Sequence, residues 1–467
     1  MAYTAFITRI KNLRQHPNAD RLQMGECFGN TVIVSMDYTD NQLGIYFPSD
    51  GQVSVEFADA NNLLRKKDEN GNNIGGYMDE SKRNVTAIKL RGEKSDGLFL
   101  PLKSLESFGD ITTLKEGDRI DTFNGHEICC KYIPRRNHRS EHVYNGNKTR
   151  KKKIDVAPLF TEHADTEQLA YNLAAFKAGD EIEITLKMHG TSQRTAYLPV
   201  FKGYKRTLWD KILRKEGTPI YDWGYVSGTR RTVLENYEGG YYGSNEFREQ
   251  HSKFFEGKLW KGEEVYYEVV GFTHTGTPIM ASCNNKKLND KEFIKQYGNE
   301  TVFSYGCEPT GKAGVGITER DVPQSDIYVY RMTMTNEDGD VVEYTPDFMR
   351  YRCEQMGVKT VPVMWNGTIP KYEPAWFNSP EEANGLAPDY TIPINAGEYV
   401  KKVAEIFYDG PDPIGKTHVR EGVVVRILNR PKFCAYKHKN WSFKALEGIV
   451  KVEAEAPDME EAQDVTE

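Results

Sequence analysis

The stretch from Glu181 to Ser192 constrains the fold most, because it sets a lysine at the end of an apolar strand. The run Glu183-Ile184-Thr185-Leu186 predicts a strand, and Lys187 follows it just before the tight turn His189-Gly190-Thr191-Ser192. A glycine in such a turn lets the backbone come close to a bound ligand. A lone lysine beside a Gly-Thr-Ser turn is more often a solvated side chain, so the motifs further along decide its meaning.

Four such motifs follow in order. They are Ser227-Gly228-Thr229-Arg230-Arg231-Thr232, Tyr266-Tyr267-Glu268-Val269-Val270-Gly271, Glu421-Gly422-Val423-Val424-Val425-Arg426 and Tyr436-Lys437-His438-Lys439. The paired arginines suit a phosphate or a ribose, and the two lysines of the last motif point to one face of an extended strand. Each motif alone has a plain reading, as a surface strand or a solvated edge.

Together these residues suit nucleophilic chemistry on a phosphate. An attacking lysine must be uncharged, and a second ammonium about 4 Å away disfavours its charged form by roughly 4 kcal/mol at an effective dielectric near 20. Lys437, Lys439 or a bound metal ion would supply this effect, and the lysines would then neutralise charge on the phosphate. Glu268 and Glu421 suit either a hydrated Mg²⁺ or ribose hydroxyls.

In this order the five motifs resemble those of the covalent nucleotidyltransferase superfamily, which comprises RNA ligases, DNA ligases and capping enzymes. Within it they look like the RNA ligase 2-type RNA-repair ligases, over residues 180–445. His189 favours that branch, because DNA ligases and capping enzymes usually carry Lys-x-Asp-Gly there. The chain departs from the pattern at Leu186, where relatives often place a polar residue, and in insertions at 58–84, 200–220 and 273–325. The C-terminal domain of RNA ligase 2 is expected to be absent.

The resemblance implies an ATP-dependent RNA ligase that seals 3′-hydroxyl and 5′-phosphate ends through a lysyl-AMP intermediate. The catalytic residues would be Lys187, Lys437, Lys439 and Glu421. The nucleotide contacts would come from Leu186, Met188, His189, Gly190, Ser192, Arg231, Glu268 and Tyr330, with Tyr330 stacked on adenine. Glu421 and Glu268 would hold Mg²⁺, or Mn²⁺ in its place. The expected substrate is nicked duplex RNA or an RNA–DNA hybrid, and the expected state is a monomer that acts in RNA repair.

The first 125 residues predict a small β-barrel, because short strand-like runs alternate with turns. These runs cover residues 5–10, 31–36, 43–47, 87–90, 97–101 and 119–123. Two segments, His16-Pro17-Asn18-Ala19-Asp20-Arg21-Leu22 and Arg91-Gly92-Glu93-Lys94-Ser95-Asp96-Gly97-Leu98, resemble the N-terminal OB module of the RNA ligase 5 group. His16-Pro17-Asn18 also reads as a simple strand-ending turn.

The rest of the chain predicts an α+β domain between residues 161 and 450, a nucleotidyltransferase domain of antiparallel sheets with flanking helices. Helices are expected over residues 166–176, 245–255, 347–356 and 397–406. Strands are expected over 181–187, 265–272, 326–335, 341–345 and 421–428. The complete fold class is therefore α+β, with an OB-fold barrel followed by the adenylyltransferase domain.

Charge is segregated along the chain. Residues 126–160 predict a basic linker in which Lys151, Lys152 and Lys153 are candidate RNA contacts, although a solvated linker is an equal reading. A second basic cluster comprises Lys202, Lys205, Arg206, Lys211, Arg214 and Lys215. After Lys451 the chain carries acids and no basic residue, and these acids account for the net charge of -7. Residues 451–467 therefore predict a disordered acidic tail.

Composition excludes several classes of protein. No apolar run approaches the roughly 18 residues of a membrane span, and the N-terminus lacks the pattern of a secretory signal. The 7 cysteines include no Cys-x-x-Cys pair, which predicts reduced thiols in the cytoplasm. Two alternatives stay open: a DNA ligase or capping enzyme, and an RNA-binding protein with a vestigial nucleotidyltransferase fold. His189 argues against the former, and the intact Lys187 and glutamates argue against the latter.

Overall fold

The computed structural model divides the chain into two compact units. Unit 1 comprises residues 1–143, 284–299 and 441–467, and unit 2 comprises residues 144–283 and 300–440. The residues that the structure describes are 3–49, 51–66, 75–132, 155–161, 163, 166–207, 217–230, 233–234, 237, 246–274, 276, 278–280, 283–284, 291, 294–295, 300–301, 305–307, 325–371, 395–415, 418–446 and 450–451. None of the helices among them is long and apolar enough to cross a membrane.

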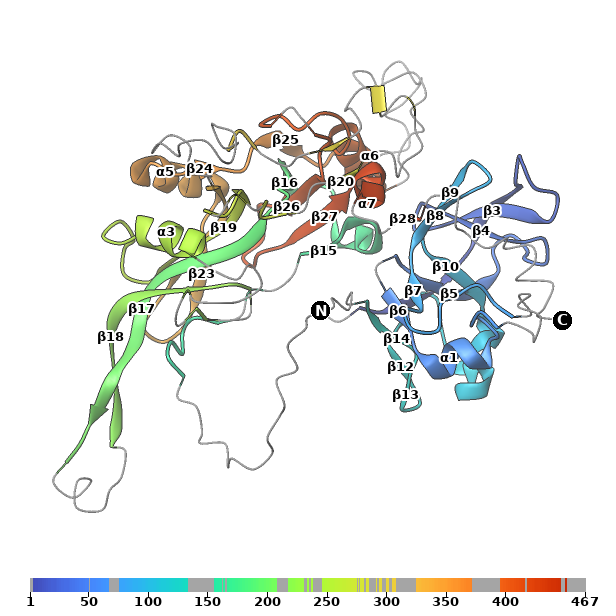
Figure 1. Cartoon of the computed structure of the whole chain (residues 1–467), viewed down its shortest axis with the longest axis horizontal. Coiled ribbons are helices and arrows are strands. Elements are labelled where there is room, and N and C mark those ends of the chain that lie inside the picture. The colour runs from blue at the N-terminus through green and yellow to red at the C-terminus, as the bar shows by residue number, and fades with distance from the viewer. Residues whose placement is uncertain are drawn as a thin grey trace. The chain divides into compact units, whose positions relative to one another are not determined.

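Unit 2 is built on two sheets (Figure 1). The first has the order β15-β27-β26-β16-β25, formed by β15 (Glu167–Gln168), β27 (Ala435–Lys439), β26 (Gly422–Ile427), β16 (Glu181–Leu186) and β25 (Val363–Thr368). The second has the order β18-β17-β19-β22-β23, formed by β18 (Thr218–Gly228), β17 (Thr191–Lys205), β19 (Glu263–Gly271), β22 (Ser325–Thr335) and β23 (Val341–Glu343), with β24 (Lys359–Thr360) beside β22. A short pair, β20 (Cys283–Asn284) and β21 (Glu300–Thr301), stands apart from both.

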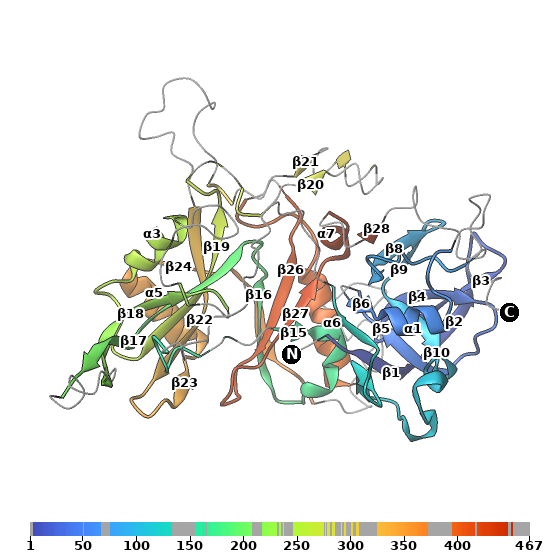
Figure 2. The ribbon, with the colours of Figure 1, turned by 60° about the horizontal axis from the view of Figure 1, so that its bottom comes forward.

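Each sheet is covered by helices on one face. Helix α6 (Ala396–Phe407) packs Val400 and Val403 against Val423 and Val425 of the first sheet, an arrangement that Figure 2 shows beside β27. Helices α3 (Glu246–Phe254) and α5 (Pro346–Met356) cover the second sheet. These helices therefore leave the opposite faces of the sheets for other residues.

Local signals explain where α5 and α6 begin and end. The Thr345 side chain accepts the Phe348 N–H, Pro346 occupies the first turn of α5, and Gly357 ends the helix with a φ of 72°. The Asn395 side chain caps α6 in the same way by accepting the Glu398 N–H. These helices match the predicted spans 347–356 and 397–406 closely.

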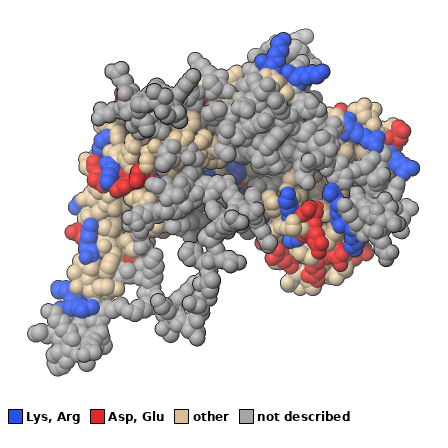
Figure 3. Space-filling model, viewed as in Figure 1, with Lys and Arg blue, Asp and Glu red and all other residues tan. Residues whose placement is uncertain are grey.

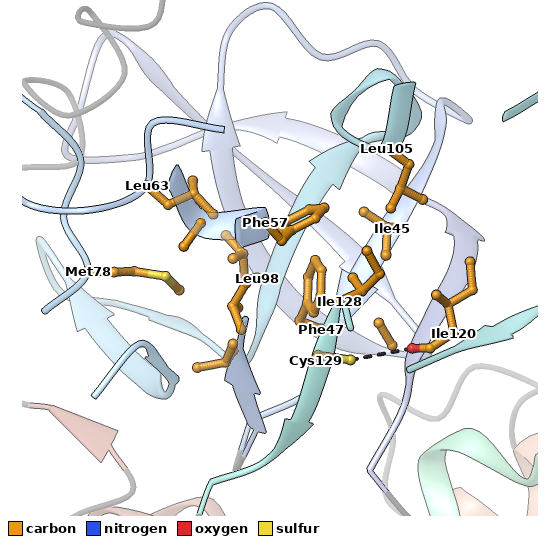
Figure 4. Packing of buried hydrophobic residues seen from close by; sticks show 14 of the residues in the cluster. Ile45, Phe47, Phe57, Leu63, Met78, Leu98, Leu105, Ile120, Ile128 and Cys129 are labelled. Atoms are coloured by element: carbon orange, nitrogen blue, oxygen red, sulfur yellow. Dashed lines mark hydrogen bonds between the residues drawn. The ribbon is translucent and has the colours of Figure 1, made fainter. Parts of the chain in front are cut away.

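Unit 1 consists mainly of short strands. Its elements are β1 (Ala5–Arg9), β2 (Lys11–Gln15), β3 (Leu22–Cys27), β4 (Asn30–Ser35), β5 (Leu43–Phe47), β6 (Gly51–Val53), α1 (Val55–Ala60), β7 (Asn84–Val85), β8 (Ala87–Leu90), β9 (Glu93–Ser95), β10 (Leu98–Pro101), β11 (Arg119–Ile120), β12 (Thr122–Phe123), β13 (His126–Glu127), β14 (Cys129–Lys131), α7 (Trp441–Leu446) and β28 (Val450–Lys451). Among the described residues these strands pair in separate small sheets, such as β10-β5-β1-β11 and β2-β3-β4. Figure 4 shows the core between them, where Phe47 and Phe57 lie with ring centroids 5.4 Å apart.

The C-terminal end of the described chain completes unit 1. Strand β28 pairs in parallel with β8, with Val450 opposite Ala87. Lys444 of α7 forms an ion pair of 2.6 Å with Asp96, and the Lys94 ammonium lies 4.4 Å from the centre of the Trp441 ring. Unit 1 therefore combines segments near both ends of the sequence with residues 284–299, and the two segments of unit 2 lie between these in the chain.

Most predicted elements are confirmed, and one helix is wrong. Residues 166–176 form strand β15 and two short 3-10 turns, Leu169–Tyr171 and Leu173–Ala175, instead of a helix. The pairing of Glu167 and Gln168 with β27 competes with the helix, and Asn172, with a φ of -131°, separates the two turns. The structure also contains a β-ribbon in which β17 enters the predicted insertion at 200–220 as far as Lys205 and β18 begins within it at Thr218.

We expect removal of residues 441–467 to destabilise unit 1, because it deletes α7 and the strand that pairs with β8. Hydrogen exchange of the amides of Ala87–Leu90 should become faster, since the edge of β8 loses its partner. A chain that ends after Lys451 is the control, because it keeps both elements and lacks only the acidic tail. Equal protection of β8 in the two truncated chains would contradict the pairing.

Candidate active site

Lys187 directly follows β16, an interior strand of the first sheet. Its strand β16 pairs with β26 in an antiparallel register that sets Leu186 opposite Val423, and the Lys187 N–H donates to the Gly422 carbonyl at 3.0 Å. Leu186 is only 1% exposed and so anchors the strand in the core. The next side chain is thereby held at the end of a rigid strand.

The Glu421 carboxylate is the centre of the site. Its Oε1 lies 2.5 Å from the Lys187 Nζ and 3.3 Å from the Lys439 Nζ, and its Oε2 lies 3.3 Å from the His189 Nδ1. The register that pairs Gly422 with Lys439 brings the second lysine there. Lys187 and His189 from one loop and Lys439 from a distant strand thus share one buried carboxylate.

The cations decide the charge state of Glu421. Burial raises the pKa of this carboxyl group, but the ammonium groups of Lys187 and Lys439 outweigh burial and hold the pKa well below its usual range. Glu421 is 3% exposed, so little water screens these interactions. The carboxylate is therefore ionised in the folded protein.

Two glycines are required by close approaches of the backbone. A Cβ atom at Gly190 would lie 2.4 Å from the Val269 carbonyl oxygen, so only glycine lets the loop pass β19. Gly422 has a φ of 143°, and a Cβ atom there would lie 2.1 Å from the His438 carbonyl oxygen. These contacts bind the loop after Lys187 to the second sheet and β26 to β27.

The second sheet supplies Glu268, Ser192 and Tyr330. Ser192 lies opposite Glu268 in the β17–β19 register, and its Oγ is 3.0 Å from the Tyr330 Oη. Burial raises the pKa of the half-buried Glu268 to about 7, against the opposing effects of Lys187 and Arg230. Glu268 therefore interacts electrostatically with Lys187, although the two residues belong to different sheets.

Arg231, Lys151, Lys152 and Lys153 lie outside the described residues, whereas the neighbouring Arg230 is described and acts on Glu268.

Lys437 lies two residues before Lys439 on the same strand and pairs in register with Val424. The side chains of Met188 and Leu186 are both buried. The predicted contacts of these two residues with a nucleotide would therefore involve their backbone atoms, and they remain a prediction.

The sequence did not single out Tyr305 or Arg248 for this site. The Tyr305 hydroxyl accepts the His189 N–H at 2.7 Å, although Tyr305 belongs to the insertion at 273–325. Arg248 of α3 donates to the Thr191 Oγ1 at 2.5 Å and to the Ser192 carbonyl at 3.2 Å. A lone tyrosine in an insertion and a lone arginine on a helix carry no sequence signal of such contacts.

The donor set bears on the kind of metal ion that fits. Among the described residues no group of three or more His, Cys, Asp or Glu side chains forms a metal cage. The two carboxylates, Glu421 and Glu268, instead suit a hard cation that keeps several waters and shares phosphate oxygens with a substrate, which is how Mg²⁺ is usually bound. The residues present therefore fit such an ion.

Sequence comparison finds no matching family model and no matching curated protein. Structural comparison finds Naegleria gruberi RNA ligase. One variant of it, solved with ATP and Mn, has a TM-score of 0.52 at 15% identity and covers 96% of this chain and 99% of that chain. The same ligase with PPi gives 0.51 at 16% identity, over 94% and 97%. An apo variant gives 0.52 at 16% identity, over 96% and 98%. The chain thus has the fold of an RNA ligase, a sheet-rich α+β fold.

We expect Tyr305→Phe to lower the free energy of unfolding by about 1–3 kcal/mol, the cost of leaving a buried amide such as that of His189 without its acceptor. Chemical denaturation measures this change. Tyr328→Phe is the matched control, because Tyr328 is also buried and its hydroxyl makes no hydrogen bond within the described part of the chain. Equal losses in the two variants would refute a specific role of the Tyr305 hydroxyl.

We expect the stability of the ligand-free protein to depend on the ionisation of Glu268. Its pKa in the folded state, about 7, lies above the ordinary value of 4.5, so its contribution is present below pH 4.5 and is lost as the pH rises through 7. The loss is at most roughly 3 kcal/mol, because partial exposure screens the charge.

Denaturation of the wild type and of Glu268→Gln at pH 5 and pH 8 tests this. The variant should lose less stability between the two pH values, whereas Glu354→Gln, an exposed glutamate on α5, should behave as the wild type does. A Glu268→Gln variant with an unchanged pH dependence would contradict the expectation.

Proposed function

We propose that this protein is an ATP-dependent RNA ligase that joins 3′-hydroxyl and 5′-phosphate RNA ends through a lysyl-AMP intermediate. The observation that carries this proposal is the convergence of Lys187, Lys439 and His189 on the buried Glu421 carboxylate. The similarity to structures of an RNA ligase supports it, as does the presence of ATP and Mn in those structures.

In the first step the Lys187 Nζ attacks the α-phosphorus of ATP. A P–N bond forms, the bond to the bridging oxygen breaks, pyrophosphate leaves, and the amine gives up a proton. The contact with Glu421 holds the Lys187 side chain in position, but it also favours the ammonium form of the lysine. Glu421 must therefore pair with another cation before Lys187 can attack as a neutral amine. A divalent metal ion held by Glu421, with Glu268 nearby, would supply that positive charge and would polarise the phosphate.

The two later steps use the same groups. The AMP moves from Lys187 to the 5′-phosphate of an RNA end, and the 3′-hydroxyl then attacks to form the phosphodiester and release AMP. Lys439, and Lys437 on the same strand, would neutralise the charge that develops on the phosphate. Ser192, Arg231 and Tyr330 would hold the ribose, phosphate and adenine of the nucleotide.

The remaining parts of the proposal concern the substrate and the setting. The N-terminal residues 1–125 would form an OB-fold domain, and the linker with Lys151, Lys152 and Lys153 would contact the RNA backbone. The segments resembling the OB module do meet in unit 1, where the Asn18 side chain donates to the Arg91 carbonyl at 2.7 Å. The substrate would be nicked duplex RNA or an RNA–DNA hybrid, bound by a cytoplasmic monomer.

Incubation with α-labelled ATP and Mg²⁺ tests the proposal. The wild type should become covalently labelled, and Lys187→Ala should not, because the amine that forms the P–N bond is missing. Glu421→Gln should label at least about 100-fold more slowly, a loss typical of removing one electrostatic group from an active site. The control is Lys177→Ala, which removes an exposed lysine shortly before the strand.

Other results separate the alternatives. Labelling by GTP instead of ATP would indicate a capping-type enzyme. A protein that binds RNA and takes no label from either nucleotide would be an RNA-binding protein with a vestigial site. Sealing of nicked DNA in preference to nicked RNA would identify a DNA ligase.

A further inference from the structure

A long ribbon leaves the second sheet of unit 2. Strands β17 and β18 pair over eleven positions, from Arg194 opposite Gly228 to Lys205 opposite Thr218, whereas the pairing of β17 with β19 ends at Ala196. Beyond that point the ribbon continues without the rest of its sheet (Figures 1 and 2). We refer to residues 197–207 and 217–225 as the arm.

The arm is stiffened on both faces. On one face the rings of Tyr197 and Tyr225 stack with centroids 4.6 Å apart, and Phe201 meets Tyr221 further out at 6.0 Å. On the other face Leu198 and Val200 pack against residues 157–160. A bare two-stranded ribbon is marginally stable in water, so these contacts explain why a defined arm forms.

The outer half of the arm is positively charged. Between residues 200 and 222, its described part carries Lys202, Lys205 and Arg206, all exposed, against the single acid Asp222. Lys202 and Lys205 form no ion pair with an acid among the described residues. Figure 3 shows Lys and Arg side chains toward the free end of the ribbon. Because Lys202 and Lys205 are exposed and have no such ion pair, their charges can interact with a ligand.

The length of the arm sets how far these positive charges can lie from the active site. Ser192, at the start of β17, belongs to the candidate active site, and Lys205 lies 13 residues further along the same strand. At about 3.3 Å per residue this corresponds to at most roughly 43 Å. Each strand of B-form DNA carries one phosphate about every 3.4 Å of helix axis, and at that spacing the distance corresponds to roughly a dozen nucleotides.

We propose that the arm binds the phosphate backbone of the polynucleotide about a dozen nucleotides from the break, through Lys202 and Lys205. This inference rests on the proposed function, because it places the RNA end at Lys187. Contacts with phosphate oxygens alone convey no base sequence, so the arm would sense the length of the duplex flanking a break and not its sequence. Short broken fragments would then be poorer substrates than breaks within long helices.

Binding of nicked RNA duplexes of two lengths tests the proposal. One duplex extends 6 base pairs on each side of the nick and the other extends 20, and the proteins are the wild type and Lys202→Ala/Lys205→Ala. For the long duplex the variant should bind about tenfold more weakly, and the slope of log K against log salt should fall in magnitude by about 1.8, or 0.9 for each lost phosphate contact. For the short duplex the two proteins should bind alike.

The matched control is Lys253→Ala/Lys401→Ala, which removes two lysines from helices α3 and α6, each paired with a glutamate four residues along. It should bind both duplexes as the wild type does. An equal loss on long and short duplexes, or no loss on either, would overturn the proposal. So would a wild type that binds the two lengths equally.

The binding assay needs no catalysis, which separates this inference from the proposed function. Length-dependent binding that disappears in the arm variant would support the arm even if Lys187 took no label from ATP. Normal labelling of Lys187, together with unchanged duplex binding by Lys202→Ala/Lys205→Ala, would support the proposed ligase function and contradict the proposed role of the arm. Labelling without RNA should be equal in the wild type and in Lys202→Ala/Lys205→Ala, because the arm lies outside the nucleotide site.

Discussion

The burial of the Glu421 carboxylate is the interaction on which the arrangement of the site depends. A buried charge is costly unless cations and hydrogen-bond donors surround it, so the fold must bring Lys187, Lys439 and His189 to it. The antiparallel registers of β16, β26 and β27 meet this requirement, because they set the ends of three strands side by side. A shift of one residue in either register would turn one lysine to the other face and remove its ion pair with the carboxylate.

The two sheets contribute carboxyl groups of different character to the site. Glu268 is half-buried and its pKa is raised to about 7, so it holds its charge weakly, whereas Glu421 holds its charge firmly. Two carboxylates with such different environments are suited to different tasks. Glu421, which stays ionised, is suited to binding a cation, and Glu268 is suited to exchanging a proton or to forming a hydrogen bond with a hydroxyl group. Gly190 makes this pairing of sheets possible, because the loop there passes β19 in van der Waals contact.

The sequence predicted the parts of the site that have strong local patterns. The strand before Lys187, the strand after Glu421 and helices α5 and α6 have clear local sequence patterns, so their positions were predicted within one or two residues. Tyr305 and Arg248 were missed, because only tertiary packing brings them to the loop that follows Lys187.

The arm was missed for a different reason. Pro199, Gly203 and Pro219 resemble strand breakers, but Pro199 lies beyond the last residue that pairs with β19, and Gly203 follows a bulge in the register. A two-stranded ribbon tolerates such residues, whereas a central strand does not. The helix predicted over 166–176 shows the opposite error, a predicted element that does not form. Pairing with β27 outweighs a favourable helical pattern there.

The pairing of Lys187 with Glu421 spans 234 residues of sequence, and β28 joins β8 from the other end of the chain. During synthesis the chain must therefore be made as far as Glu421 before the first contact can form, and as far as Val450 before the second. Contacts at such separation form late and slowly, because the entropy of closing the chain opposes them. The lysine thus remains without its carboxylate partner until Glu421 has been made, so a chain that terminates before Glu421 would carry the Lys187 loop but no assembled site.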